Sequence, residues 1–525
     1  MPPDKPNTNL QQVSASEVDE RFSALLSNAN AIRAIASAVQ GTLGPKGLNC
    51  MLVDRFGDVT ITNDGSAILD KIEVNHPAAK MLIHTAKAQE TEVGDGTTTA
   101  TLLAGALIGE AVNHAAKGVP VTKIIEGMRE GVARAIEAVR ASSRPLSGLD
   151  DPLLRQAALI AGRGHDDIAA LVVQAARLVG AEALLDPAFK LAEWVVAKEG
   201  AEGEAVTGLV IAKERLNRQM PRERRNVRVL VVDDALEPEE IHDDALGTDA
   251  GFAKYLELKE QFRQALQNVI DLGVGLVAVD GPVGDLAEEM LTDAGVMVIR
   301  RVSRRDLSRL IEHTGARALK RAGLAREPGQ LKRLLGRARH VIEDERLGHL
   351  RITGGAGKPM ATIVVGAATS EVKDERQRIA EDAASAVQQA IRGGVVAGGG
   401  AAEMAAVAAV QRLRRRTRGM AAYGVDCVIE ALKRPLIQIV ANAGFNPLEK
   451  IGDLTVAAAQ RQDGHLAIDC DTGEVADMLD LGVVDPTPVK VYALRAAGEI
   501  AEAILSIDTI IKKRDQDGGS PAAQR

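Results

Sequence analysis

Aromatic residues are scarce in this chain of 525 residues, where Phe, Tyr and Trp together contribute 2 %. Hydrophobic residues of all kinds still make up 46 % of the sequence, so extensive buried cores remain available. Because there are too few aromatic rings to fill them, we expect cores built from Ala, Val, Leu and Ile. A chain of this length has room for about two to four such domains.

Cysteine is also rare, and its three copies (Cys50, Cys427 and Cys470) are scattered without a CxxC pair. This spacing argues against a cysteine zinc site and indicates a reducing compartment. No apolar run approaches the roughly 18 residues that a membrane helix needs. Residues 1–18 lack the apolar core of a secretory signal. We therefore expect a cytoplasmic protein with no membrane partner.

The chain has no excess of positive charge. Its 64 basic and 72 acidic residues give a formal net charge of −8, which argues against nucleic acid as the main partner. One basic run, from Arg412 to Arg418, departs from this balance. We interpret it as the end of a solvated or intersubunit helix rather than as a nucleic-acid site.

A P-loop is missing as well, because Gly357-Lys358 is followed by Pro359 instead of the Ser or Thr of a Walker A motif. The chain has instead the heptapeptide Val93-Gly94-Asp95-Gly96-Thr97-Thr98-Thr99, followed by the apolar segment 100–112. The two glycines let a phosphate approach the backbone, and the three threonines supply hydroxyl donors. A helix that starts here directs its unpaired N–H groups at the loop, which predicts an anion site.

Asp95 at first contradicts this prediction, because it would repel a bare phosphate by about 4 kcal/mol at about 4 Å in an effective dielectric of about 20. Its position makes sense if it holds Mg²⁺, which binds a carboxylate together with phosphate oxygens. The heptapeptide by itself fits an ordinary helix cap equally well, since Asp and Thr are common capping residues. Both interpretations stay open at this point.

Hydrophobic periodicity and breakers divide the rest of the chain into three regions. The first is predicted to hold a helix over 17–40, a hairpin over 50–54 and 58–62, and helices within 76–139 and 151–180. The middle region alternates strands with helices, with strands at 228–232, 274–279 and 296–302, a helix over 252–271, and a polar excursion over 237–251. The last region is predicted to hold a helix over 371–392, the glycine loop 393–400 and a helix over 401–413. If both loops bind one ligand, the two ends of the chain form one domain and the middle is inserted.

Five short motifs in this order carry a resemblance: Gly44-Pro45-Lys46-Gly47, Thr62-Asn63-Asp64-Gly65, His76-Pro77-Ala78-Ala79-Lys80, Gly94-Asp95-Gly96-Thr97-Thr98-Thr99 and Val396-Ala397-Gly398-Gly399-Gly400. Together they resemble the chaperonin family over residues 20–512. Residues 208–214, with Met220-Pro221 and the excursion near 237–255, resemble its archaeal and eukaryotic (thermosome, group II) branch. Some bacteria carry similar proteins, called group III. Asp485 looks instead like the bacterial GroEL-type branch, and Arg163 stands where many thermosomes have Lys.

The resemblance implies a multidomain α and α/β fold with a mainly helical equatorial domain, a small intermediate domain and an α/β apical domain. In this chain the equatorial domain would comprise residues 1–141 and 393–525. The intermediate domain would comprise 142–208 and 362–392. The apical domain would span 209–361, with a helical lid protrusion at about 236–256.

The resemblance also implies roles for individual residues in ATP binding and hydrolysis. Asp64 and Asp382 would be the carboxylates that act on the attacking water, and Asp95 the Mg²⁺ ligand. The remaining nucleotide contacts would be Leu43, Gly44, Pro45, Gly96, Thr97, Thr98, Thr99, Arg163, Gly399, Gly400, Asp469, Cys470, Asp471 and Asp485. Without the resemblance, Asp382 would read as a solvated helix residue.

The implied function is that of an ATP-driven chaperonin: an ATPase that encloses unfolded protein clients in two stacked rings. The resemblance predicts eight subunits per ring, a built-in lid and no separate cap protein. Two other functions stay open from the residues. The same loop could serve a small-molecule kinase, although no second motif offers an acceptor site, or a nucleotide-regulated scaffold that assembles without folding clients.

Overall fold

The computed structural model describes residues 9–57, 59–239, 248–461 and 464–508. Contacts between Cα atoms divide the chain into two compact units. Residues 1–164 and 385–525 form one, which we call the terminal unit, and residues 165–384 form the other, the middle unit. Each is described by itself.

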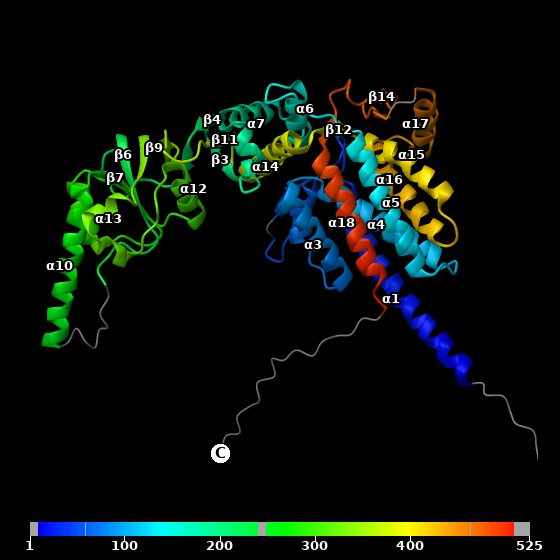
Figure 1. Ribbon diagram of the computed structural model, residues 1–525, viewed down its shortest axis with the longest axis horizontal. Helices are drawn as coiled ribbons and strands as arrows, with labels where there is room; N and C mark the ends of the chain where they lie inside the picture. Colours follow the sequence, from blue (N-terminus) through cyan, green and yellow to red (C-terminus); the bar gives the residue numbers. More distant parts are fainter. Residues whose placement is uncertain (1–8, 58, 240–247, 462–463, 509–525) are drawn as a thin grey trace, which may run out of the picture. The chain divides into compact units, whose positions relative to one another are not determined.

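The terminal unit is a helical bundle with short strands at its margins (Figure 1). Its N-terminal segment contains α1 (Asn9–Gln40), β1 (Cys50–Val53), β2 (Val59–Thr62), α2 (Gly65–Lys71), α3 (Pro77–Val93), α4 (Thr97–Ala115), α5 (Val121–Ala141) and α6 (Pro152–Ala161). Its C-terminal segment contains β12 (Val395–Ala397), α15 (Ala401–Arg416), α16 (Ala421–Asn442), α17 (Pro447–Arg461), β13 (Leu466–Ile468), β14 (Val475–Asp477), β15 (Val484–Pro486) and α18 (Thr487–Leu505). Helix α14 (Ser370–Gly393) runs from the middle unit into this segment.

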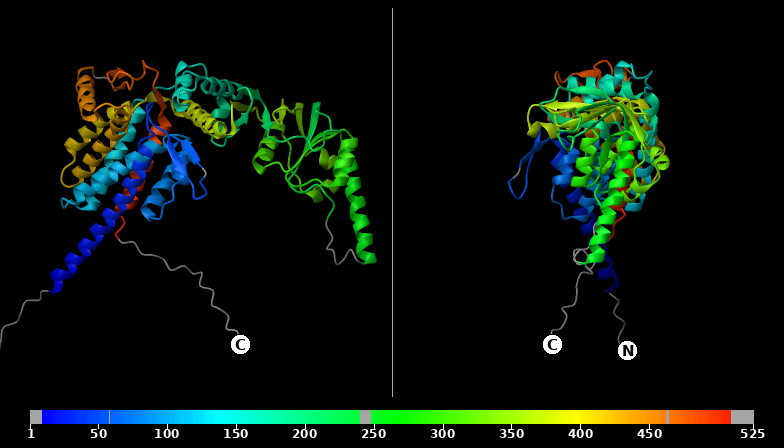
Figure 2. Two further views of the ribbon diagram at one scale, coloured as in Figure 1. Left: turned by 180° about the vertical axis from the view of Figure 1, so that it is seen from behind. Right: turned by 90° about the vertical axis from the view of Figure 1, so that its left-hand side faces the viewer.

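Helix α4 lies at the centre of this bundle, in contact with α1, α16 and α18. Figure 2 shows the same bundle from behind. The buried cluster around α4 consists, among the described residues, of Ala, Val, Leu, Ile, Met and Cys side chains without an aromatic ring. Ile108, Leu103 and Ile124 are among the largest fully buried ones. The expectation of an aliphatic core is confirmed for this cluster.

The middle unit is built on two mixed sheets. The larger has six strands in the order β5-β10-β9-β6-β7-β8, and the smaller has three in the order β3-β11-β4. The strands are β3 (Val195–Glu199), β4 (Glu204–Thr207), β5 (Leu209–Ile211), β6 (Glu223–Val232), β7 (Val274–Val279), β8 (Met297–Ile299), β9 (Gly336–Asp344), β10 (His349–Thr353) and β11 (Ala361–Ala367). The helices are α7 (Asp166–Val179), α8 (Ala181–Leu185), α10 (Asp249–Asp271), α11 (Asp285–Asp293), α12 (Arg304–Thr314) and α13 (Pro328–Lys332), with the 3-10 helices η1 (Leu191–Trp194) and η2 (Arg321–Ala325).

Several predicted boundaries were wrong. Helix α1 begins at Asn9 instead of residue 17 because residues 9–17 contain no glycine or proline that would stop it. Strand β6 begins at Glu223 because its polar first half pairs with β9, a contact that no local pattern reveals. Helix α10 begins at Asp249, inside the predicted excursion, where the Thr248 side chain accepts from Gly251 N at 3.1 Å. Residues 240–247 of that excursion lie outside the described part of the chain.

Candidate nucleotide site

The threonine loop lies between α3 and α4, and two left-handed glycines shape it. Gly94 ends α3 with φ of 70°, and Gly96 precedes α4 with φ of 82°. Gly96 has no side chain that could cap α4, and the Asp95 Oδ1 atom accepts from Gly96 N at 2.5 Å. Asp95 therefore bonds to the loop itself rather than to the first turn of α4. This geometry leaves the N-terminus of α4 without a side-chain cap and favours the anion-site interpretation over an ordinary cap.

The Asp95 carboxyl is half-buried in this loop. Burial, with a smaller contribution from the nearby Asp485 carboxylate, raises the pKa of Asp95 to about 6. The Gly96 N–H group and the positive charges of Lys490 and Arg163 oppose that rise. A carboxylate that is hard to ionise alone gains most from a cation, so Asp95 fits an Mg²⁺ ligand.

Asp64 lies directly before α2 and caps it, accepting from Ser66 N at 3.0 Å and from Ala67 N at 3.1 Å. The next residue, Gly65, packs against the threonines of α4. A Cβ atom on Gly65 would overlap Thr98 Oγ1 and lie 3.1 Å from Thr97 Oγ1. The structure therefore brings Asp64 beside the threonine loop, which starts about 30 residues later in the sequence.

Arg163 has a left-handed backbone, with φ of 54°, and donates from Nη1 to Asn63 Oδ1. Its charge also acts on Asp95. A positive φ is uncommon for a residue other than glycine, and here it ends α6, where Gly164 N donates to Leu159 O at 2.8 Å. Arg163 thus hydrogen-bonds Asn63, which precedes Asp64, and its positive charge acts on the Asp95 carboxylate.

The glycine loop after β12 meets the strand that carries Asp485. Val396 of β12 pairs with Asp485 of β15 in an antiparallel ladder. A Cβ on Gly398 would lie 3.2 Å from Asp485 Oδ2, and one on Gly399 would lie 3.4 Å from Met478 Sδ. Gly400, with φ of 86°, comes so close to helix α16 that a Cβ would lie 2.9 Å from Leu436 Cβ. Only glycine therefore fits at Gly400.

Lys490, which the sequence analysis missed, lies almost fully buried beside Asp485. Its Nζ atom is 2.8 Å from Asp485 Oδ2 and 2.9 Å from Glu403 Oε1. Burial alone would lower the pKa of Lys490, but the Asp485 and Glu403 carboxylates outweigh burial and raise it. A signal was available in retrospect: Lys490 is a charged residue within the apolar stretch 489–494.

Gln89 is a second residue that the sequence analysis missed. Its buried side chain donates from Nε2 to Asp95 O at 2.7 Å and to Val489 O at 3.3 Å. It therefore ties the threonine loop to the start of α18, 400 positions later.

The turn after α1 is fastened to α16 and to the β13–β14 hairpin. Asn442 Nδ2 donates to Leu43 O at 2.8 Å, and a Cβ on Gly44, whose φ is 87°, would lie 3.1 Å from Ile439. Lys46 Nζ lies 2.6 Å from Asp471 Oδ1. These contacts bring the predicted residues 43–45 and 469–471 to one side of the terminal unit.

Within the loop 469–471, the three residues differ in exposure and bonding. Asp469 accepts from Asp471 N at 2.9 Å, and this backbone bond, with the Thr472 hydroxyl, lowers the pKa of Asp469. The Cys470 thiol is half-buried, and burial raises its pKa. Pro45, across the Lys46–Asp471 pair, is exposed.

Asp382 lies on α14 within the middle unit and is half-buried. Ser385, one helical turn later, already belongs to the terminal unit, where it packs against Gly94 so closely that a Cβ there would overlap its Oγ. Gln389 Nε2 of the same helix donates to Glu92 O at 3.4 Å. The C-terminal part of α14 thus lies against the threonine loop, and the role of Asp382 stays a prediction.

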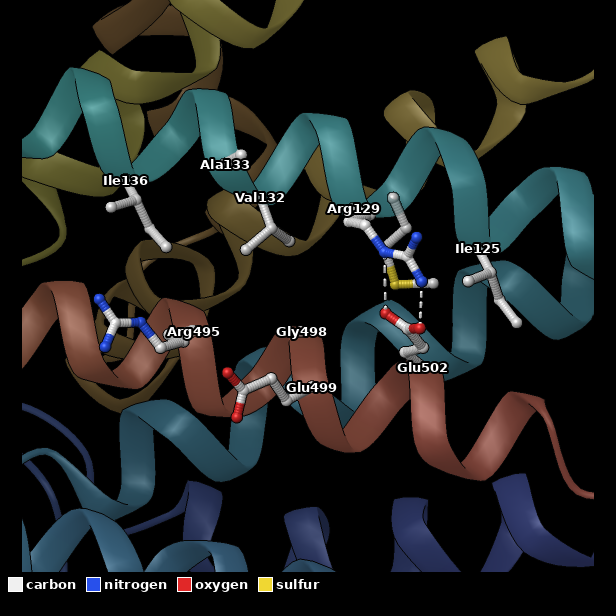
Figure 3. A pocket seen from close by; sticks show the side chains of 10 residues that line it. Ile125, Arg129, Val132, Ala133, Ile136, Arg495, Gly498, Glu499 and Glu502 are labelled. Carbon is white, nitrogen blue, oxygen red and sulfur yellow. Dashed lines mark hydrogen bonds and ion pairs between the residues drawn. The ribbon is translucent and has the colours of Figure 1, made fainter.

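Two searches over the described residues bear on other kinds of site. No three His, Cys, Asp or Glu side chains converge as metal ligands there, so a metal ion would depend on few carboxylates and on its substrate. No helix in the same part of the chain is long and apolar enough to cross a membrane. A groove between α5 and α18, bridged by the Arg129–Glu502 ion pair, contains none of the predicted site residues (Figure 3).

Comparison with known proteins agrees with this architecture. The TCP-1/cpn60 chaperonin family model matches residues 35–515. A thermosome subunit beta of Archaeoglobus fulgidus is 34 % identical over 515 residues, covering 94 % of this chain and 93 % of the relative. A thermosome subunit of Pyrococcus horikoshii is 34 % identical over 522 residues, with the same coverage of both chains. The crystal structure of a group III chaperonin in the open state superposes with a TM-score of 0.87 at 45 % identity, covering 94 % of this chain and 100 % of that one.

The helical bundle, the inserted α/β unit and the loop-to-helix site define an ATP-dependent chaperonin architecture. This chain belongs to the TCP-1/cpn60 chaperonin family. It is an ATPase that uses nucleotide to assist unfolded protein clients, and it assembles into rings. The resemblance stated from the sequence, the fold class and the chaperone function are thereby confirmed.

Proposed function

We propose that the nucleotide binds in the terminal unit between the threonine loop and the glycine loop. The single observation that supports this proposal is the convergence of distant segments: Asp95 from the first segment is coupled to Asp485 and Lys490 from the last. Gly96 and the Thr97–Thr99 hydroxyls would hold the phosphates at the N-terminus of α4. Leu43, Gly44, Pro45, Gly399, Gly400, Asp485 and residues 469–471 would surround the nucleoside.

Asp95 would hold Mg²⁺. Its position at the loop and its raised pKa fit this role, because a nearby cation would stabilise the ionised carboxylate. When bound, the ion would neutralise charge on the phosphates. Arg163 would lie near the terminal phosphate, where a guanidinium can stabilise charge that develops in phosphoryl transfer.

Asp64 and Asp382 would orient and polarise the attacking water. Asp64 is held rigidly by its two bonds to the α2 backbone, whereas Asp382 would enter from the middle unit. Hydrolysis would then require that α14 first brings Asp382 to the attacking water, so a conformational step would precede the chemical step.

The test is the pair of variants Asp382→Ala and Asp64→Ala in steady-state ATP hydrolysis and in ATP binding. Both should bind ATP near normally, and both should lose turnover by about 100-fold or more. Asp374→Asn, an exposed carboxylate on the same helix, is the matched control and should turn over normally. Near-normal turnover of Asp382→Ala would remove Asp382 from the mechanism.

For assembly we propose two stacked rings, each of eight subunits, with a built-in lid around residues 236–256 and no separate cap protein. The similarity to a group III chaperonin structure supports assignment to that group. The domain bounds proposed are 1–141 and 393–525 (equatorial), 142–208 and 362–392 (intermediate), and 209–361 (apical). Electron microscopy with and without ATP tests ring number, symmetry and lid closure, and refolding yield with and without ATP tests chaperone action against a passive scaffold.

A further inference from the structure

The side chain of Gln89 holds the backbone of the threonine loop. Gln89 lies in the C-terminal part of α3, is fully buried, and donates from Nε2 to Asp95 O at 2.7 Å. The hydrogen-bond ladder of α4 begins only at Gly96 O, which accepts from Ala100 N at 2.9 Å. Because the Asp95 carbonyl comes before that ladder, it is bound by the Gln89 side chain rather than by the helix.

The same amide group also contacts the last segment of the chain. Gln89 Nε2 donates to Val489 O at 3.3 Å, and an amide NH₂ group has two hydrogens, enough for both carbonyls. Val489 lies in the first turn of α18, and the next residue, Lys490, pairs with Asp485. Gln89 therefore fixes the position of Asp95 relative to the charged residues at the start of α18.

The packing around this amide is tight. A Cβ atom on Gly96 would lie 2.9 Å from Gln89 Nε2 and 2.8 Å from Val489 Cγ1. Real Cβ atoms do not approach other atoms so closely, so the amide reaches Asp95 O only because residue 96 has no side chain. The Gly96 backbone, the Gln89 amide and the Val489 side chain thus fill the space between the threonine loop and α18.

The Gln89 amide also has a cost that packing alone does not explain. Its Oε1 atom is buried and has no hydrogen-bond partner among the described residues. A methionine would fill nearly the same space without leaving a buried acceptor unpaired. The two bonds that Gln89 donates are therefore the property that sets it apart from an apolar residue at this position.

Asp95 is bonded on two sides and keeps one carboxylate oxygen available. Gln89 binds its carbonyl, and its Oδ1 atom accepts from Gly96 N at 2.5 Å. Within the described part of the chain, no residue donates a hydrogen bond to the other oxygen, Oδ2. A cation that binds Asp95 would therefore use Oδ2, and the position of this atom depends on the backbone that Gln89 holds.

We propose that Gln89 is a positioning residue for the metal ion of the nucleotide site, because its amide fixes the Asp95 backbone against α18 and so places Asp95 Oδ2 for Mg²⁺. This inference rests on the proposed role of Asp95 as the Mg²⁺ ligand. Removal of a group that orients a metal ligand usually lowers metal affinity by about 10- to 100-fold. Loss of the Gln89 amide should therefore weaken the binding of ATP with Mg²⁺ and leave the binding of metal-free ATP nearly unchanged.

The first experiment measures the affinity of the assembled full-length protein for a non-hydrolysable ATP analogue by titration calorimetry, with Mg²⁺ and with EDTA in its place. Mg²⁺ should tighten binding to the wild type. In Gln89→Met this gain should fall by about tenfold or more, while the affinity without metal stays within about twofold. Asn28→Leu, which replaces another buried amide of the terminal unit, should keep the wild-type gain. A wild-type gain in Gln89→Met, or an equal loss of affinity with and without Mg²⁺, would overturn the proposal.

The second experiment distinguishes positioning from a general loss of structure by measuring steady-state ATP hydrolysis over a range of Mg²⁺ concentrations. In Gln89→Met the Mg²⁺ concentration for the half-maximal rate should rise by about tenfold, and excess Mg²⁺ should restore kcat to within about threefold of the wild type. A loss of kcat that excess Mg²⁺ does not restore would contradict the proposal. If Gln89→Met fails to assemble, Gln89→Asn carries both experiments with the same expected shifts, because its amide is one methylene too short to reach both carbonyls.

Asp95→Asn measured alongside separates the two proposals. If Asp95→Asn loses the Mg²⁺ gain and the Gln89 variants keep it, the role of Gln89 alone is refuted. A normal gain in Asp95→Asn would refute Asp95 as the Mg²⁺ ligand, and the inference about Gln89 would fail with it. If both residues act on the same ion, the double variant should lose no more of the gain than Asp95→Asn does.

Discussion

At the residue scale, Asp95 lowers the stability of the nucleotide-free protein when it is ionised, and the same carboxylate is the proposed Mg²⁺ ligand. Its pKa near 6 in the nucleotide-free protein lies above the ordinary value of 3.8. The folded protein therefore binds this proton more tightly than the unfolded chain does. The contribution of Asp95 to stability is greatest below about pH 4, decreases as the pH rises to about 6, and is constant above that. A bound cation would stabilise the ionised carboxylate and so restore the stability that is lost above about pH 6.

We predict that the affinity for ATP in the presence of Mg²⁺ falls about tenfold for each pH unit below 6, because a protonated Asp95 cannot ligate the ion. Titration calorimetry between pH 5 and about 7.5 measures it. ATP itself also titrates, so Asp95→Asn is the control and should bind more weakly with a flatter profile. Identical pH profiles for the two proteins would show that Asp95 does not hold the metal.

Lys490 neutralises two carboxylates of the candidate site, those of Asp485 and Glu403. Replacing it by Met leaves the buried Glu403 and the half-buried Asp485 without a counter-charge. We expect a loss of about 3–5 kcal/mol in the terminal unit. Lys123→Met, whose pair with Glu126 is half exposed, should cost less than about 1 kcal/mol. The thermal midpoints of the nucleotide-free variants measure the difference, and equal shifts would contradict it.

At the scale of elements, the start of α2 packs directly on the start of α4. Gly65 allows this contact because it has no Cβ. In Gly65→Ala the new methyl group would displace the Thr98 hydroxyl, so we expect ATP affinity to fall by about tenfold or more while the helix itself tolerates alanine. Gly109, farther along α4, has no atom within 4 Å of its would-be Cβ. Gly109→Ala should therefore keep ATP affinity and stabilise the protein by about 0.5–1 kcal/mol.

Isothermal titration with ATP and thermal unfolding, both run on the two glycine variants, check this prediction. A Gly65→Ala protein with wild-type affinity would mean that the threonine hydroxyls do not contact the phosphates.

At the scale of the whole molecule, the hairpin β1–β2 presents an apolar face to solvent in the single chain. Met51 opposite Ile61 and Val53 opposite Val59 are all 54–63 % exposed. Such a face and a free strand edge call for a partner. We predict that the neighbouring subunit of the ring supplies this partner.

We therefore predict that Met51→Glu with Ile61→Lys weakens ring assembly and that ATPase activity falls with it. Sedimentation velocity at several protein concentrations measures the assembly. Lys80→Glu, an exposed change on α3, is the control and should leave the rings intact. Intact rings in the hairpin variant would exclude this face from the subunit contact.

The local hydrophobic pattern predicted those elements that depend only on their own residues, such as the hairpin β1–β2 and strand β7. The hairpin over 50–62 follows from alternation around the turn at Gly57, and β7 was predicted with its observed bounds because its six apolar residues are buried on both faces. Strand β6 was predicted too short because pairing with β9, more than 100 residues away, extends it. Backbone pairing of that kind depends on the partner strand rather than on local propensity.

The loop-to-helix turns, the aliphatic core around α4 and the family could be predicted from residue types at short, fixed spacings. Only the folded structure revealed Lys490 between Asp485 and Glu403, and Gln89 bonded to Val489. Each of these groups acquires its chemistry from burial beside a partner distant in the sequence. Burial and the electric field of neighbouring charges exist only after the chain has folded, so the local pattern could mark Lys490 as unusual but could not name its partners.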